Sequence, residues 1–323
     1  SHSFSYQIPN VTCMPSLFYL LVGLSCATCL HAITNRRAAK RKVSSCEGAS
    51  PALLCKVQKS GGSTVQVFAK GCHRFLSFGA DIQESWQARV RCTNTNCAKY
   101  NVTVNDEAKC PPCPCEKPGD IFDDDMYTNV PIFDKVKPVC ESATEDQPID
   151  ILMVGLGGAA LHRQILQKCP KGTRLSTIEY DAPLVGLAQN YFGLEIIPRV
   201  SEVHVGDALN TVKKLQVDRK NILSGALGKA GWDAVVVDCF DDDGIPDSCK
   251  SIDFLSTVQR LLKRPSGIIV QHVYHDWPGH ISQRIEFNQV MANYRAVFGD
   301  GDVSITKFPE ELSDIESIIV ASV

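Results

Sequence analysis

The feature that most constrains the fold of this chain is an apolar run that breaks into glycines, Ile151–Gly158 (ILMVGLGG). Residues 159–168 follow it with helical periodicity. Glycines let the backbone turn sharply and approach a ligand closely, where a Cβ would obstruct it. This pattern predicts a strand, a tight ligand-binding turn and a helix.

The same alternation of apolar runs and helical patterns continues to the end of the chain. It predicts an α/β fold over 149–323, a Rossmann-like, doubly wound parallel sheet. A helix near 281–298 and two final strands predict a C-terminal antiparallel hairpin at the sheet edge. The strands are expected at 149–154, 174–179, 200–205, 232–238, 267–273, 303–308 and 316–323, with further helices near 159–168, 182–192, 208–216 and 251–263.

Acidic residues stand at the ends of three of these strands. Glu179 is placed to accept hydrogen bonds from two ribose hydroxyls, and Asp207 to contact the amine of adenine. Asp207 equally suits the N-cap of a helix that begins at Ala208, and both roles stay open. Asp238 and Asp241 stand at the carboxyl end of the fourth strand. Together these positions predict a nucleoside site.

The glycine spacing alone does not select the nucleoside. Gly155-x-Gly157-x-x-Ala160 also satisfies the dinucleotide fingerprint, so NAD stays open. A dinucleotide binder needs a helix N-terminus for its phosphates, whereas a sulfonium nucleoside needs carboxylates near the adenine and the positive sulfur. The acids and the terminal hairpin favour S-adenosylmethionine or its decarboxylated form.

With these motifs the chain resembles the spermidine synthase-like branch of class I S-adenosylmethionine-dependent methyltransferases, best over 149–276. The resemblance implies that Gly155, Gly157 and Gly158 line the methionine part, that Glu179 holds the ribose, and that Asp207 with Ala208 contacts adenine. It also implies a general base at Asp238 and a residue that holds an amine substrate at Asp241. The motifs that carry it are Val154–Gly158, Ile178–Asp181, Ala188–Gly193, Gly206–Ala208 and Val237–Asp241.

The chain departs from the polyamine synthases in two respects, and both argue against aminopropyl transfer as its activity. Those enzymes continue the glycine loop with an Asp, where this chain has Ala159–Leu161. Their amino-terminal β-hairpin domain is replaced by a cysteine-rich segment. We therefore expect a methyltransferase with an unknown small-molecule or protein acceptor. A catalytically silent, secreted binding or scaffold protein is the second hypothesis, and a polyamine aminopropyltransferase is the third.

Other reactive side chains near these motifs have plainer interpretations. His272 and His275 flank the end of the fifth strand, and we interpret them as hydrogen-bonded polar residues without a metal. Cys239 follows Asp238, but no base accompanies it, so we do not expect a nucleophile.

Nine of the fifteen cysteines lie between Cys46 and Cys140. Short β-like runs with cysteines over 46–115 predict a small β module held by disulfides because its own core is too small. Its cysteine pattern resembles that of secreted three-finger modules. A zinc site at Cys110, Cys113 and Cys115 is the alternative, which the intervening prolines disfavour. The acidic, proline-containing residues 116–148 predict a linker.

An apolar stretch over 14–32 has the length of a signal peptide. The alternative is a signal anchor with the basic residues 36–42 on the cytoplasmic side. We therefore expect a secreted protein or one in the lumen of the secretory pathway, with a membrane-anchored form as the alternative. The net charge of −3 gives no basic field for nucleic acid. A homodimer is also compatible with this sequence.

Overall fold

The computed structural model describes the chain over 52–59, 62–70, 73–78, 86–91, 103–104, 129–144, 146–198, 200–223, 231–241, 244–275, 281–308, 313 and 315–323. The statements below concern these residues. The predicted leader 14–32, the cysteines at 110, 113 and 115, and the basic residues 36–42 lie outside them. No helix within them is long and apolar enough to cross a membrane.

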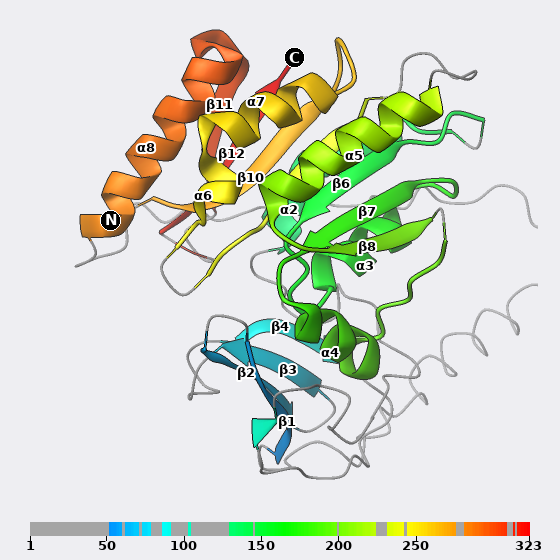
Figure 1. Ribbon diagram of the computed structural model, residues 1–323, viewed down its shortest axis with the longest axis vertical. Helices are drawn as coiled ribbons and strands as arrows, with labels where there is room; N and C mark the ends of the chain where they lie inside the picture. Colours follow the sequence, from blue (N-terminus) through cyan, green and yellow to red (C-terminus); the bar gives the residue numbers. More distant parts are fainter. Residues whose placement is uncertain are drawn as a thin grey trace, which may run out of the picture. The chain divides into compact units, whose positions relative to one another are not determined.

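The carboxy-terminal part is built on a seven-stranded sheet, which confirms the predicted fold class (Figure 1). Five neighbouring strands at one side of the sheet are parallel, and the two strands at the other edge form the expected antiparallel hairpin. In sheet order the strands are β11 (Val303–Lys307), β12 (Glu316–Ser322), β10 (Ile268–Tyr274), β9 (Ala234–Val237), β6 (Asp150–Val154), β7 (Arg174–Glu179) and β8 (Ser201–Val205).

Helices cover both faces of this sheet, as expected for buried parallel strands. One cluster of buried residues joins the sheet to α5 (Ala208–Leu223), α7 (Ile252–Leu261) and α8 (Ile281–Phe298). A second cluster joins the opposite face to α2 (Asn129–Glu141) and α3 (Ala160–Lys168). The short helix α6 (Asp247–Lys250) precedes α7. All residues of β6 and β9 are buried, and all of them are apolar except Asp150, the first residue of β6.

The small β-rich segment expected before this domain forms a five-stranded sheet. Its order is β4 (Trp86–Arg91), β3 (His73–Phe78), β2 (Thr64–Lys70), β1 (Ala52–Gln58) and β5 (Thr103–Val104). The first four strands are antiparallel neighbours, and β5 runs parallel to β1.

This small sheet does not depend on disulfides alone for its core. Its buried side chains, among them Val57, Val67 and Leu76, pack in one cluster with Tyr191 and Phe192 of α4 (Ala182–Phe192). The core of this small sheet is therefore shared with the large domain, as expected for a segment whose own core is too small. Cys55 is disulfide-bonded, and the other cysteines of 46–115 lie outside the described residues. The secreted three-finger character stays a prediction.

The range expected to be a linker contains a helix in its described part. The helix α2 buries Ile132, Phe133 and Val136 against the sheet. A disulfide between Cys140 and Cys169 ties its end to the residue that follows α3. Two prolines hid this helix from sequence analysis. Pro131 lies in the first turn, where proline is tolerated, and Pro138 lies inside the helix.

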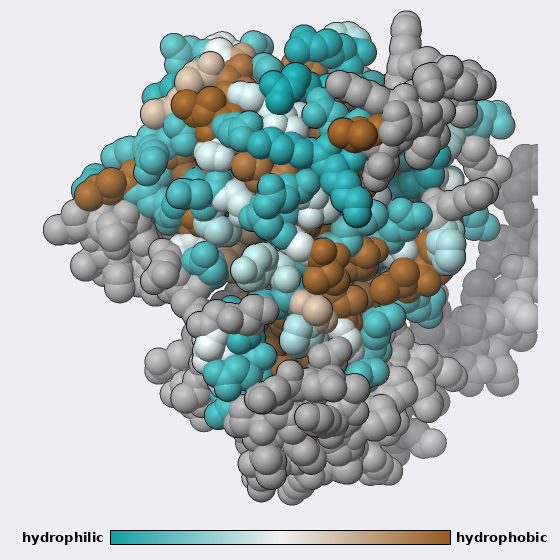
Figure 2. Space-filling view, in the orientation of Figure 1, coloured by the Kyte–Doolittle hydropathy of each residue, from teal (hydrophilic) through white to brown (hydrophobic). Residues whose placement is uncertain are grey.

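The surface of the large domain is mainly hydrophilic on the face seen in Figure 2, with separate hydrophobic patches between polar residues. Single exposed apolar side chains are normal on a folded protein. The most exposed of them, Tyr180, is 64% accessible and lies beside the site described next.

Candidate functional site

All eight residues predicted to form the site line one cavity of about 500 Å³. The cavity lies at the carboxyl ends of β6, β7 and β9. The strand order reverses between β6 and β9, and a crevice at such a reversal is where open α/β sheets bind ligands. A second cavity of about 410 Å³, which includes Arg163, Lys171 and Glu195, contains none of the predicted residues.

The register of the parallel strands β6, β7 and β9 brings Gly155, Glu179 and Asp238 together. Val154 pairs with Ile178 on one side and with Val237 on the other. The next residues along the three chains, Gly155, Glu179 and Asp238, therefore lie in one row at the carboxyl ends of the strands. The site is a direct consequence of where three strands end.

Gly155 cannot be replaced without moving the backbone. Its φ is +94°, and a Cβ there would collide with the carbonyl oxygen of Asp238. Gly157 also has a positive φ, +51°, but no atom lies near the position of its missing Cβ. Gly155 thus allows two strand ends to touch, while Gly157 leaves open space at the cavity. Such space is what a ligand beside the loop requires.

Glu179 holds the glycine loop as well as lining the cavity. Its Oε2 accepts from the backbone N–H of Leu156 at 3.0 Å, and its Oε1 accepts from that of Asp181 at 2.9 Å. The residue is 6% exposed, and burial raises its pKa while these hydrogen bonds oppose the rise. A carboxylate has about four lone-pair sites, so each oxygen retains capacity for a ribose hydroxyl.

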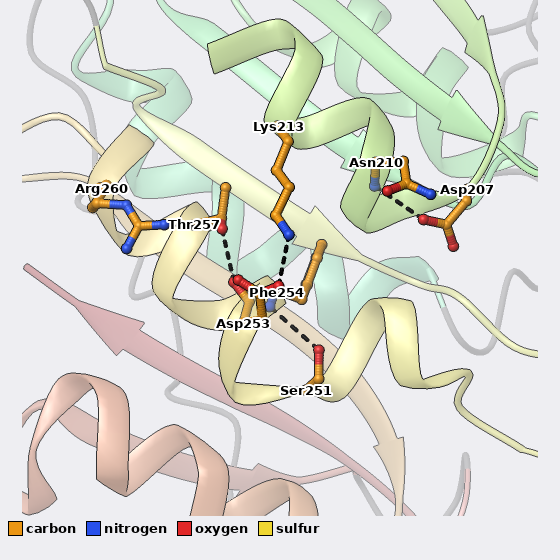
Figure 3. A network of polar contacts seen from close by, with 8 residues as sticks. All are labelled: Asp207, Asn210, Lys213, Ser251, Asp253, Phe254, Thr257 and Arg260. Carbon is orange, nitrogen blue, oxygen red and sulfur yellow. Dashed lines mark hydrogen bonds and ion pairs between the residues drawn. The ribbon is translucent and has the colours of Figure 1, made fainter. Parts of the chain in front are cut away.

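Asp207 is the N-cap of α5, one of the two roles that the sequence left open. Its Oδ1 accepts from the backbone N–H of Asn210 at 2.9 Å (Figure 3). The helix is also tied to α7, because Lys213 forms a 2.6 Å ion pair with Asp253. Asp207 and the buried Ala208 both line the cavity, so the cap does not exclude the second role, contact with adenine. The N-terminus of α5 is thereby held at the cavity wall.

The loop that carries Asp241 is braced from two sides. A disulfide joins Cys239 to Cys249 of α6, which agrees with the absence of a nucleophilic role for Cys239. Glu286 of α8 accepts from the backbone N–H of Ile245 at 3.1 Å and pairs with Lys250 at 2.5 Å. Asp241 itself exchanges backbone hydrogen bonds with Gly244. The described residues on either side of this turn, Asp241 and Gly244, are therefore held in place.

Asp238 has an ionic partner, His272, that was not predicted from the sequence. The Nδ1 atom of His272 lies 3.0 Å from Oδ1 of Asp238, and its Nε2 lies 3.6 Å from Oε2 of Glu316. No local motif marks this contact, because Asp238 and His272 are 34 positions apart. Only the pairing of β9 with β10 predicts it, since Val237 faces Gln271.

The small sheet also contributes to the cavity, which no sequence signal indicated. Lys59, Ser63 and Phe78 line it together with the exposed Tyr180 of the large domain. The Nζ atom of Lys59 lies 4.8 Å from the centre of the Phe78 ring, a cation–π contact. Among the described residues, no group of three or more His, Cys, Asp or Glu side chains is arranged to hold a metal ion.

Comparisons with known proteins agree with this architecture. No protein-family model matches the chain. A polyamine aminopropyltransferase from Vibrio vulnificus (strain CMCP6) is 26% identical over 154 residues, which are 48% of this chain and 45% of that protein. An eEF1A lysine and N-terminal methyltransferase from Danio rerio is 30% identical over 126 residues, which are 39% of this chain and 16% of that protein. The matches thus span less than half of either relative.

Two solved structures share the fold. A probable spermidine synthase from Corynebacterium glutamicum ATCC 13032 has a TM-score of 0.52 at 14% identity, over 83% of this chain and 79% of that one. A spermidine synthase in complex with the transition-state analogue AdoDATO has the same score and identity, over 84% and 73%. Residues 149–323 are little more than half of the chain, so both matches extend into the part before them. The chain has a spermidine synthase-like, class I methyltransferase fold.

Proposed function

We propose that this chain is an S-adenosylmethionine-dependent methyltransferase of the spermidine synthase-like group. One observation carries the proposal: the glycine turn, the Glu179 carboxylate and the acids Asp207, Asp238 and Asp241 all line one cavity. Such a cavity suits a nucleoside with a positive sulfur, since its lining has carboxylates at several points around one small space. The curated relatives, an aminopropyltransferase and a methyltransferase, support the same cofactor chemistry.

The bound cofactor would supply an electrophilic methyl group on its sulfonium. The chain would hold the nucleoside through Glu179 and Asp207, with the methionine part beside Gly155–Gly158. Asp238 is the proposed base for a protonated acceptor, and Asp241 is proposed to hold that acceptor. Alignment and exclusion of water then supply most of the acceleration in a direct displacement. The acceptor is a small molecule or a protein.

Aminopropyl transfer is the second candidate, because the small sheet lies within the part matched by the spermidine synthase structures. The glycine loop argues against it. Where the resemblance places an Asp of the polyamine synthases, this chain has Ala159–Leu161, and Ala159 is buried with a left-handed φ of +59°. An alanine offers no carboxylate to the cofactor's amine or propylamine end.

Calorimetric titration of the full chain tests the proposal and separates these candidates. The ligands are S-adenosylmethionine, its decarboxylated form and S-adenosylhomocysteine. We expect micromolar binding of the two carboxylated ligands and weaker binding of the decarboxylated one. The reverse preference would support aminopropyl transfer. A folded chain that binds none of the three would leave the silent binding or scaffold protein.

A variant at Asp207 shows whether the cavity is the binding site. Asn is as good an N-cap as Asp, so Asp207→Asn should retain the start of α5 while removing the charge. We expect at least about tenfold weaker binding of S-adenosylhomocysteine if Asp207 contacts adenine, as loss of a charged hydrogen bond predicts. Asp253→Asn is the matched control, because it removes a carboxylate paired with Lys213 that does not line the cavity.

A further inference from the structure

The contact between Asp238 and His272 belongs to a row of three ionisable side chains on neighbouring strands. Asp238 follows β9, His272 lies in β10, and Glu316 begins β12. The two contacts of the imidazole, 3.0 Å to Asp238 and 3.6 Å to Glu316, use both of its ring nitrogens. Asp238 is 26% exposed at the cavity, whereas the His272 side chain is 3% exposed. The row therefore runs from the cavity into the core.

Aromatic rings fix the plane of the His272 imidazole. Phe308 stacks on it at 5.4 Å with an interplanar angle of 18°, and Phe240 meets it edge-on at 5.0 Å. The Tyr274 ring lies 5.4 Å away. Rotation of the imidazole would displace these neighbours, and Phe240 also lines the cavity. The ring can therefore act as a rigid support for the Asp238 carboxylate.

The charges in this row favour an imidazolium. Burial opposes the positive charge, but the carboxylates of Asp238 and Glu316 overcome it and raise the pKa of His272 to about 9. Tyr274 is the other titratable group in contact, and burial together with both carboxylates raises its pKa far above its ordinary value. At neutral pH His272 thus donates from Nδ1 to Asp238 and faces Glu316 with a second N–H.

We propose that His272 is a positioning residue that holds Oδ1 of Asp238 and so presents Oδ2 of the same carboxylate to the cofactor cavity. The inference rests on the proposed function, since it concerns the group proposed to act on the acceptor. It assigns a role to a histidine that sequence analysis interpreted as a plain polar residue. Glu316 supports the same arrangement from the far side of the ring.

The charge pairing can be measured without any ligand. In the full chain with labelled histidine, NMR titration should place the pKa of the His272 imidazole near 9. Asp238→Asn and Glu316→Gln should each lower it by about one unit or more, as loss of an adjacent opposite charge predicts. Asp207→Asn is the control and should not move it, although Asp207 lines the same cavity. A titration at or below about 6.5 would overturn the proposal.

The positioning role is tested by a double-mutant cycle on the affinity for S-adenosylhomocysteine. His272→Gln should weaken binding by about tenfold, the size expected for a misplaced charged hydrogen bond. In the Asp238→Asn background the same substitution should have no further effect, because there is no longer a carboxylate to hold. A purely structural histidine would weaken binding equally in both backgrounds, and that additivity overturns the positioning role.

The two experiments separate this inference from the proposed function. A raised pKa of His272 together with a non-additive cycle supports both. If the pKa of His272 is raised but the wild-type chain binds no S-adenosylhomocysteine, the proposed function is overturned, and the positioning role with it. The ion pair between His272 and Asp238 then remains only as a structural contact. Normal binding with an unshifted His272 overturns the inference alone.

Discussion

At the residue scale, the site depends most on Gly155, where two strand ends touch. Gly155→Ala should lower the free energy of unfolding by about 3 kcal/mol or more, because φ is +94° and the new Cβ meets the Asp238 carbonyl. Gly157→Ala is the matched control: its φ of +51° is less strained and its surroundings are open, so about 1–2 kcal/mol is expected. Urea unfolding of both variants measures the difference, and equal losses would contradict the described turn.

A second prediction at this scale concerns His162 in α3. Its ring nitrogens lie 2.7 Å from Oγ1 of Thr177 and 2.8 Å from Oγ of Ser201, and its pKa is lowered to about 4 by burial and then by Arg163. The unfolded chain therefore takes up a proton that the folded chain refuses between about pH 6.5 and 4. The stabilisation is fully present above pH 6.5 and is lost as the pH falls towards 4.

The loss from this histidine amounts to about 3 kcal/mol when complete. Urea unfolding of the wild type and of His162→Gln at several pH values between 4 and 7 measures it. The variant should lose less stability on acidification than the wild type does. Parallel curves for the two proteins would show that His162 does not titrate as described.

At the element scale, two disulfides have different relations to the site. The Cys239–Cys249 bond closes a loop that includes Asp241, and the Cys140–Cys169 bond ties α2 to the residue after α3. Removing either bond by paired Ala substitutions should cost about 3 kcal/mol of stability through the entropy of the unfolded chain. Only the first pair should also weaken binding of S-adenosylhomocysteine, by several-fold, because it frees the acidic loop.

Calorimetry on the two paired variants under conditions where both remain folded separates stability from binding. The Cys140/Cys169 variant serves as the control for lost stability. Equal losses of affinity in the two variants would mean that the acidic loop needs no covalent brace, and that Glu286 with Lys250 suffices.

The order of the helices and strands could be predicted from the sequence because each element has a local sequence pattern. The strand β9, and β6 after its first residue Asp150, are buried apolar runs, and the glycines and acids follow them directly. The sheet could therefore be predicted, as could the gathering of the eight candidate residues around one cavity. The helix α2 was not predicted, because its prolines and acidic surroundings resemble a linker. The apolar side chains on one face of α2 are explained only by the sheet on which they pack.

At the scale of the whole molecule, contacts distant in sequence decide what the motifs cannot. Lys59 and Phe78 reach the cavity only because the small sheet packs on α4. His272 meets Asp238 only through strand pairing. Neither contact has a short sequence signature. The small-sheet residues in the cavity wall and the ionic partner of Asp238 could therefore be found only from the three-dimensional structure.

The shared core between the small sheet and α4 has a consequence for truncated chains. A chain reduced to 129–323 would expose the apolar cluster around Tyr191 and Phe192, both fully buried in the full chain. We expect it to be less stable than the full chain and to aggregate. Size-exclusion chromatography and thermal unfolding of the two forms measure this. A monomeric fragment with unchanged stability would show that the small sheet is an accessory.

We propose that the cavity at the ends of β6, β7 and β9 holds the nucleoside. A crystal structure of the full chain with S-adenosylhomocysteine tests it most directly. We predict ribose hydroxyls on Glu179, adenine beside Asp207 and Ala208, and the amino-acid part above Gly155–Gly158 near Asp238. Density for the ligand in the second cavity, near Arg163 and Lys171, or in neither cavity of a well-ordered crystal, would contradict the account.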